Sequence, residues 1–294
     1  MIVTPFVSVA AFKAHPTYLD LDDLRYGDPV SADQDAELNN LLLMSSGWAD
    51  GYLEQPLLAH QNTQNLRTRF GGTGTLKIHP DHTPVIAVSS VGYGYTPTAM
   101  TVIANPTVWS EDGRNLEITI GAGSPWSGSL QFGVPGAGAQ AYVQLVYTAG
   151  FVATTLAAPA TLGVSSLSVT DPTGIQPGVP YRIWEPGAEE TVTVSSAFIP
   201  PAVSVPPVVT AVPLAAPTLF AHAAGHDFTN MEHDTRLAVV NYTVAQLLRP
   251  DTAAEDAYPD SRQASGTRQN DSRKDGSGLI DEAERLLERL RRIR

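Results

Sequence analysis

The chain has 294 residues, no cysteine, and 18 basic against 30 acidic side chains, which gives a net charge of −12. The missing cysteines exclude disulfides, thiolate metal ligands and thiol nucleophiles. The acidic balance argues against tight binding to nucleic acid, because affinity for phosphates needs clustered Lys and Arg. No apolar run approaches the roughly 20 residues that cross a bilayer, whereas a hydrophobic content of 43% is enough for packed cores.

The charges are unevenly spread along the chain. The last 44 residues carry 19 of the 48 charged side chains, so residues 1–250 are only about 12% charged, against about 25% in typical globular proteins. Few charges and many glycines and prolines indicate a β-rich body whose surface is partly covered by partner molecules. A charged C-terminal segment follows it.

The N-terminal part combines an extended arm with a helix. Residues 1–30 are predicted to form the arm, with one short helical turn near Leu19–Leu24. A long helix is predicted for residues 32–55, because Ser31 can cap it, acidic residues fill its first turns and Pro56 fits its end. The residues of its packing face recur at a spacing of three or four: Leu38, Leu41, Leu42, Ser45, Trp48, Ala49, Tyr52 and Leu53.

Two β-rich stretches follow this helix. Short strands separated by turn residues in 66–150 are typical of a β-sandwich or an open barrel. Residues 153–221 predict a second, small β unit, and the prolines from 200 to 217 fit polyproline II or an irregular edge strand. The expected strands are Thr75–His79, Pro84–Gly92, Ala99–Ala104, Leu116–Ile120, Ser129–Phe132, Ala141–Tyr147, Ser166–Val169, Tyr181–Trp184 and Glu190–Ser195.

Two helices are predicted near the C-terminus. The first covers residues 232–249, ends at Pro250 and packs through Leu237, Val240, Val244, Leu247 and Leu248. A polar linker is expected over 251–278. The second helix, residues 279–294, has acidic residues early and basic residues late, which suits its dipole. Because a helix of this length is marginal alone, its apolar stripe predicts a docking element. Its proposed docking residues are Leu279, Ile280, Ala283, Leu286, Leu287, Leu290, Arg289, Arg291, Arg292 and Arg294.

Enzymatic motifs are missing from the sequence. There is no GxSxG, HExxH or Walker loop, and no glycine cluster is followed by a helix pattern. One group could bind Zn²⁺ or Mn²⁺ through imidazoles and carboxylates, or could simply form a polar turn leading into the next helix: His222, His226, Asp227, Glu232, His233 and Asp234. The sequence therefore predicts no enzyme and no cofactor, with a metal-dependent hydrolase at this group as an alternative.

A set of local strings, taken in order, resembles the head-to-tail connector (adaptor) proteins of long-tailed double-stranded DNA phages. The resemblance covers most of residues 10–152 and 230–294. The strings that carry it are Phe12–Leu24, Gln34–Leu43, Trp48–Asp50, Gln55–Leu57, Pro84–Val85, Tyr147–Phe151, Arg236–Leu248, Arg249–Asp251 and Asp281–Leu287.

The resemblance implies a fold class and a domain organisation. The expected fold is α+β, a helical connector core with helices near 32–55, 232–249 and 279–292, joined by a β-sandwich-like region and an inserted small β-barrel domain. The expected parts are an arm at 1–30, a connector core at 31–152 plus 222–250, the inserted domain at 153–221, a linker at 251–278 and the docking helix at 279–294.

The resemblance also implies a structural role in the virion. Such proteins form a ring, usually of twelve copies, beneath the portal protein of the capsid. The ring joins the portal to tail completion or tail terminator proteins and lines the channel through which DNA leaves without specific binding. The family implies no catalytic residue, no metal, no cofactor and no membrane contact. It places the protein at the head–tail junction, after synthesis in the host cytoplasm.

A second interpretation is a binding module. A capsid-decoration or tail-surface protein would use its β domains to hold carbohydrate or a host surface. That interpretation explains the β content but leaves the helices at 32–55 and 279–294 without a role. It predicts that exposed aromatic residues gather on one β face, for which Tyr93, Tyr95, Trp109 and Trp126 are candidates.

Overall fold

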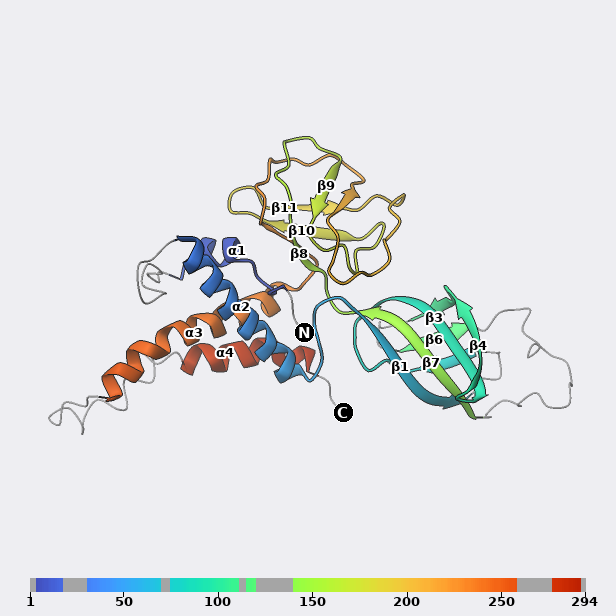
Figure 1. Ribbon diagram of the computed structural model, residues 1–294. Helices are drawn as coiled ribbons and strands as arrows, with labels where there is room; N and C mark the ends of the chain where they lie inside the picture. The colour runs from blue at the N-terminus through green and yellow to red at the C-terminus, as the bar shows by residue number, and fades with distance from the viewer. Residues whose placement is uncertain are drawn as a thin grey trace, which may run out of the picture.

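The structure, a computed structural model, describes residues 4–17, 31–69, 75–110, 115–119, 140–257 and 277–291. Its elements form three groups, each around its own cluster of buried apolar side chains. Figure 1 shows the helices on the left, one group of strands on the right and a second group of strands at the top. We call these groups the helical cluster, the sandwich and the small barrel.

The helical cluster contains α1 (Val9–Ala14), α2 (Ser31–Leu53), α3 (His233–Ala257) and α4 (Ser277–Leu287), which continues into a 3₁₀ turn, η2 (Glu288–Leu290). Apolar side chains from all four α-helices meet in its core, which removes their area from water. Each helix contributes at least one fully buried side chain, for example Phe12, Leu42, Val239 and Leu287.

Three buried hydroxyl groups inside the helical cluster, those of Ser45, Ser46 and Thr243, are hydrogen-bonded. Ser46 Oγ donates to the carbonyl of Leu42 at 2.7 Å and accepts the N–H of Phe6 at 3.0 Å. Ser45 Oγ donates to the carbonyl of Leu41 at 2.9 Å and lies 2.8 Å from Thr243 Oγ1 of α3. These hydrogen bonds therefore tie the N-terminal segment and α3 to α2 and satisfy the hydroxyl groups that make them.

The sandwich consists of two antiparallel sheets. The larger has the order β1 (His60–Arg69), β7 (Gln140–Ala149), β3 (Val85–Thr96), β4 (Ala99–Ala104). The smaller has the order β2 (Thr75–Ile78), β6 (Leu116–Thr119), β5 (Thr107–Trp109). Alternate residues of β7 are buried, as expected for a strand with one face on a core. The core between the sheets includes Leu76, Ile118, Val143, Leu145 and Tyr147.

The small barrel closes on itself. One sheet has the order β11 (Glu190–Thr193), β10 (Pro180–Trp184), β13 (Asp227–Thr229), β8 (Ala153–Thr155), and the second pairs β12 (Thr210–Pro213) with β9 (Ser166–Val169). Bridges between Leu156 and Val169 and between Val194 and Leu214 join the two sheets on both sides. The ladder of strands is therefore continuous around the barrel core.

Two chain segments meet where the three groups join. Leu58 and Phe151 form a parallel bridge, with Phe151 N–H donating to Leu57 O at 2.6 Å and Ala59 N–H donating to Phe151 O at 2.8 Å. Gly150 adopts a φ of +108° there, and a Cβ at this position would lie 2.5 Å from the carbonyl oxygen of Leu58. Only glycine fits this crossing.

The predicted fold class is wrong. The protein is not built on a helical connector core: it is mostly β-sheet, with four antiparallel sheets, and 25% of it is helical. The physical reason is that the strands do not pack as a layer upon the helices. Two of the three buried clusters in the described chain consist of side chains from strands and their connecting segments, so the helices stabilise only one of the three parts.

The helices and strands predicted from the sequence agree with the structure better than the predicted fold class does. Helices occur in all three predicted regions as α2, α3 and α4, and β4 and β9 have the predicted bounds. Pro250 does not end α3, which remains helical to Ala257, although an internal proline removes one helical hydrogen bond. The helical turn expected at Leu19–Leu24 and the strand at Ser129–Phe132 lie outside the described residues.

Candidate functional site

A buried ion pair connects three parts of the chain: the N-terminal segment, the small barrel and α3. Arg236 Nη2 of α3 lies 2.6 Å from Asp227 Oδ2 of β13, and both side chains are at most 7% exposed. Asp227 Oδ1 also accepts the N–H of Ser8 at 3.1 Å, and Arg236 Nη1 donates to the carbonyl of Phe6 at 3.1 Å. The pair therefore fastens the N-terminal segment, the barrel and α3 together through charge-assisted hydrogen bonds.

Trp184, at the end of β10, packs against the same arginine. The guanidinium carbon of Arg236 lies 5.1 Å from the indole centroid, and that of Arg182 lies 4.1 Å from it. The ring of His233, at the start of α3, stacks on Trp184 with centroids 5.7 Å apart. Cation–π attraction of this kind is worth about 0.5–2 kcal/mol per contact, depending on burial, so the indole adds a second connection between barrel and helix.

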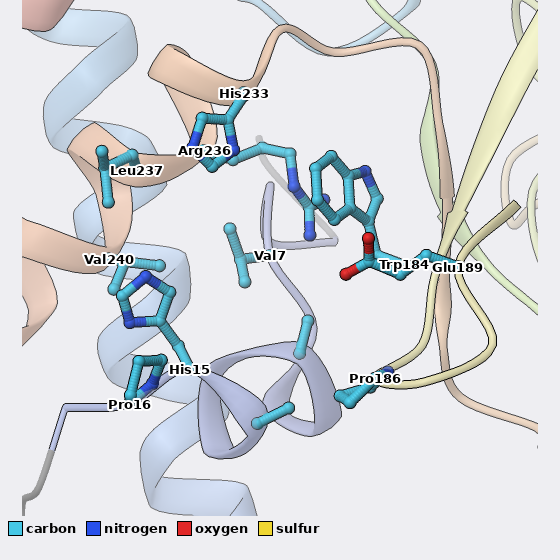
Figure 2. A pocket seen from close by; sticks show the side chains of 12 residues that line it. Val7, His15, Pro16, Trp184, Pro186, Glu189, His233, Arg236, Leu237 and Val240 are labelled. Atoms are coloured by element: carbon cyan, nitrogen blue, oxygen red, sulfur yellow. The ribbon is translucent and has the colours of Figure 1, made fainter. Parts of the chain in front are cut away.

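A pocket of about 300 Å³ opens beside this connection. Figure 2 shows Val7, Trp184, Arg236 and Leu237 converging on it from the N-terminal segment, the barrel and α3. Most of its wall is apolar: Val7, Ala11, Ala14, Pro16, Trp184, Pro186, Leu237 and Val240. Glu189, one of its charged residues, is paired with Arg182 at 2.8 Å.

His15 also lines this pocket, and its pKa is lowered by burial and, to a lesser extent, by the nearby His233. A neutral imidazole in an apolar wall, with no serine, threonine or cysteine in the lining, does not form a nucleophile–base arrangement. The pocket can accept a small apolar group, and it carries no group of residues arranged for covalent catalysis.

Two of the three histidines that the sequence grouped as metal candidates, His222 and His226, contact glutamates. His222 is fully buried, with Nδ1 2.9 Å from Glu185 Oε2 and Nε2 2.7 Å from Glu190 Oε1. Each ring nitrogen of His222 therefore lies within hydrogen-bond distance of a different carboxylate. Among the described residues, no group of three or more His, Asp or Glu side chains is arranged to hold a metal ion.

The same glutamates also hold the backbone of the segment around His222. Glu190 Oε2 accepts the N–H of Leu219 at 2.8 Å, and Glu185 Oε2 accepts that of Ala223 at 3.2 Å. Glu185 Oε1 lies 3.4 Å from His226 Nε2. This arrangement pins the β10–β11 hairpin to the segment before β13, which is a structural role inside the barrel.

The proposed docking stripe on α4 packs within the chain. Ala283 and Leu287 are fully buried in the helical cluster. Leu279, Ile280, Leu286 and Leu290 are partly buried, with Leu286 and Leu290 packed against that cluster. Docking of a partner on this stripe would require α4 to leave α3.

The end of α4 contacts α2 through polar groups. Tyr52 Oη donates to Glu288 Oε2 at 2.7 Å, and this bond to a carboxylate is the main reason that the pKa of Tyr52 is raised. Arg291 lies over the Tyr52 ring, 5.4 Å from its centroid. The side chain of Arg289, together with Arg292 and Arg294, lies outside the described residues.

The predicted packing residues of the two long helices line the helical cluster. Trp48 of α2 stacks on Tyr242 of α3, with ring centroids 4.0 Å apart and an interplanar angle of 9°. The buried members of the predicted set are Leu38, Leu42 and Val240, and its partly buried members are Leu41, Trp48, Tyr52, Leu237, Val244 and Leu248.

Among the described residues, the aromatic candidates for a binding face do not gather on one exposed β face. Tyr93 is buried in the sandwich at 6% exposure, whereas Trp109 is 60% exposed. The side chain of Tyr95 and the whole of Trp126 lie outside what the structure describes.

Sequence reasoning missed the residues that join the parts. Asp227 was noted only as a metal candidate, and neither Arg236 nor Trp184 was given a role at the site. Their contacts join positions far apart in the chain, so local spacing gives no signal for them. The adjacent pair Glu189–Glu190 was visible, but nothing in its neighbourhood points to His222, which lies 32 residues from Glu190.

Comparisons with known proteins add no identification. No protein-family model matches the chain, and no curated protein matches it. Within the described residues, no helix combines the length and the apolar character that a membrane span requires.

Proposed function

We propose that this protein is a structural subunit of a phage virion, which assembles as a ring between the portal protein and the tail completion or terminator proteins. DNA passes through this ring without specific binding. The order of connector-like strings in the sequence supports this role, and the proposal does not depend on the helical fold class that the structure corrects.

The observation that carries the proposal is the exposure of large apolar side chains on a sparsely charged body. Residues 199–209 contain no charged side chain, and five of their aliphatic residues are between 39% and 93% exposed: Ile199, Val203, Val205, Val208 and Val209. Single exposed apolar residues are normal, but five of them within one uncharged segment of eleven residues fit an interaction surface. A subunit surrounded by neighbours needs such surfaces.

The charge distribution supports the same role. A net charge of −12 disfavours lasting contacts with DNA phosphates, since affinity for DNA requires basic groups that displace counterions. The buried polar contacts described above join parts of the chain to one another, which suits a subunit that transmits contacts.

The test is the assembly state of the full-length chain, measured by native mass spectrometry and by electron microscopy, alone and with the portal protein. The expected result is a closed ring of many copies that binds the portal. A 31.3 kDa monomer under every condition, including with portal present, would overturn the proposal.

A further inference from the structure

Two strand edges of the sandwich are open in the described chain. In the sheet β1-β7-β3-β4, no described strand pairs with the outer side of β1 or of β4. Each edge strand presents backbone N–H and C=O groups that pair readily with another strand. The small barrel differs, because its two sheets are joined on both sides.

The edge at β4 lacks the features that usually prevent pairing. Its six residues, Ala99–Ala104, include no charged residue and no proline, which are common protections of a free edge. Val102 is 65% exposed, and Trp109 on β5, the next strand along the chain, which belongs to the smaller sheet, is 60% exposed. An uncharged, exposed edge strand with a β-branched side chain is suited to accept another strand.

The edge at β1 is suited to the same contact. From His60 to Leu66 the strand has no acidic residue, lysine or arginine, and Arg67 is turned onto the ring of Tyr142, 4.7 Å from its centroid. The smaller sheet contacts β1 through side chains, as when Thr68 Oγ1 donates to the carbonyl of Lys77 at 2.7 Å. Among the described residues no backbone hydrogen bond joins β1 to β2.

The directions of the two edges are complementary. Each neighbouring pair in the sheet is antiparallel, so β4 runs opposite to β1. If a second copy is placed beside the first by rotation about an axis along the strands, its β1 lies antiparallel to β4 of the first. Such a heterologous contact between two different edges repeats from copy to copy and generates a ring when the rotation closes.

We propose that β4 of one copy pairs with β1 of the next, so that the sandwiches form a continuous sheet around the ring. This inference rests on the proposed function and names the contact that builds the ring. One cross-strand row is defined by the register: Asn65 pairs with Gln144, Gln144 with Gly92, and Gly92 with Val102. Extending this row across the junction places Val102 beside Asn65 of the next copy.

Cysteine cross-linking tests the pairing directly, because the chain has no cysteine of its own. Residues facing each other on antiparallel strands are about 4.5–5.5 Å apart at Cα, which a disulfide can span. The full-length double variant Val102→Cys/Asn65→Cys should give a ladder of covalent oligomers on oxidation, which a reductant removes. Each single variant should give at most a disulfide dimer.

Two further pairs and one control complete the cross-linking set. Thr63→Cys and Arg67→Cys, each with Val102→Cys, test a register shifted by two residues on the same face. The control pair Leu162→Cys/Asn65→Cys uses a residue that is 67% exposed but lies on the barrel, outside residues 199–209, and it should give no ladder. Absence of a ladder from all three Val102 pairs overturns the inference.

A charge exchange tests the same contact by assembly. Val102→Lys should reduce the assembled fraction at least tenfold, because the lysine disrupts an uncharged junction. Adding Asn65→Glu to the same chain should restore assembly, because opposite charges then face each other between copies. Thermal unfolding of each variant checks that the subunit remains folded. Normal assembly of the Val102→Lys variant overturns the inference.

These outcomes separate the inference from the proposed function. If the wild-type protein forms rings but none of the Val102 double-cysteine variants gives a ladder, the strand pairing is refuted and the ring role is unaffected. A wild-type protein that never assembles, even with portal, refutes both.

Discussion

The small barrel and the sandwich are both built from antiparallel strands, but they differ in whether their outermost strands are paired. The barrel joins its two sheets through the bridges at Leu156–Val169 and Val194–Leu214, so its strand ladder is satisfied within one chain. The described sandwich leaves β1 and β4 as edges. The difference indicates that the barrel is stabilised from within, whereas the sandwich gains hydrogen bonds when another strand arrives. Substitutions in the two regions should therefore change different measured quantities.

The largest effect is expected where the barrel is fastened to the helices. Arg236→Met should lower the free energy of unfolding by about 3–5 kcal/mol, because it leaves Asp227 charged, buried and without its cation. Urea unfolding measures this loss. The matched control is Arg182→Met, because Arg182 also contacts the Trp184 ring but its side chain is 46% exposed, so the loss should stay below about 1 kcal/mol. Equal losses from the two variants would contradict the assigned role of Arg236.

The next-largest effect tests whether the polar contacts of His222, in addition to the apolar core, stabilise the barrel. His222→Gln should cost about 2–4 kcal/mol, because the single amide nitrogen of glutamine cannot lie against both Glu185 and Glu190, which the two nitrogens of the buried imidazole contact. The control is His226→Gln, whose side chain is 15% exposed and whose contact with Glu185 is 3.4 Å, with an expected loss below about 1 kcal/mol. Chemical denaturation followed by tryptophan fluorescence gives both values, and a smaller loss for His222 than for His226 would refute this account.

A matched pair of valines compares the closed and open regions most directly. Val169→Ala in β9 removes buried side-chain volume at 0% exposure and should cost about 2 kcal/mol. Val102→Ala in β4 changes a side chain that is 65% exposed and should alter subunit stability by less than about 0.5 kcal/mol. Differential scanning calorimetry of monomeric protein checks both. A similar loss at both sites would mean that the β4 edge is covered within the subunit.

The smallest effect concerns pH and the segment that leads into the sandwich. Asp50 accepts the N–H of Leu57 at 2.8 Å, and burial raises the pKa of this carboxyl from 3.8 to about 6. Because the folded state binds this proton more tightly than the unfolded state, the Asp50 contribution to stability falls as pH rises from about 4 to 6.

Asp50→Asn keeps the hydrogen-bond acceptor and removes the charge. The variant should lose this pH dependence and be more stable than wild type at pH 8 by about 1–2 kcal/mol, a value reduced by partial contact with solvent. Melting temperatures measured from pH 4 to pH 8 test this, and parallel pH curves for the two proteins would contradict it.

The sequence predicted elements better than it predicted their assembly. β9 and β4 were found with their bounds because β-branched residues stand between clear turn signals. β1 was missed because its residues are HQNTQNLRTR, in which Leu66 is the one apolar side chain. That strand is defined by its long pairing with β7, a tertiary feature that no local pattern encodes.

The wrong fold class has a related cause. The resemblance to connector proteins gave the helices more weight than the short strands, whereas the structure is mostly β-sheet. The candidate site was less predictable still, because Asp227, Arg236 and Trp184 meet only once the barrel has closed and α3 has docked beside it. Contacts of this kind depend on packing between parts, which residue spacing does not reveal.

The crossing at Leu58 and Phe151 has a mechanical consequence. The segment that enters the sandwich and the segment that leaves it are bonded side by side, and the carbonyl of Pro84 additionally accepts the N–H of Gly150 at 2.9 Å. A pull on the sandwich therefore loads both segments together, and the bonds between them share the force. The crossing acts as a stiff anchor, through which tension at one end of the subunit reaches the helices and the barrel.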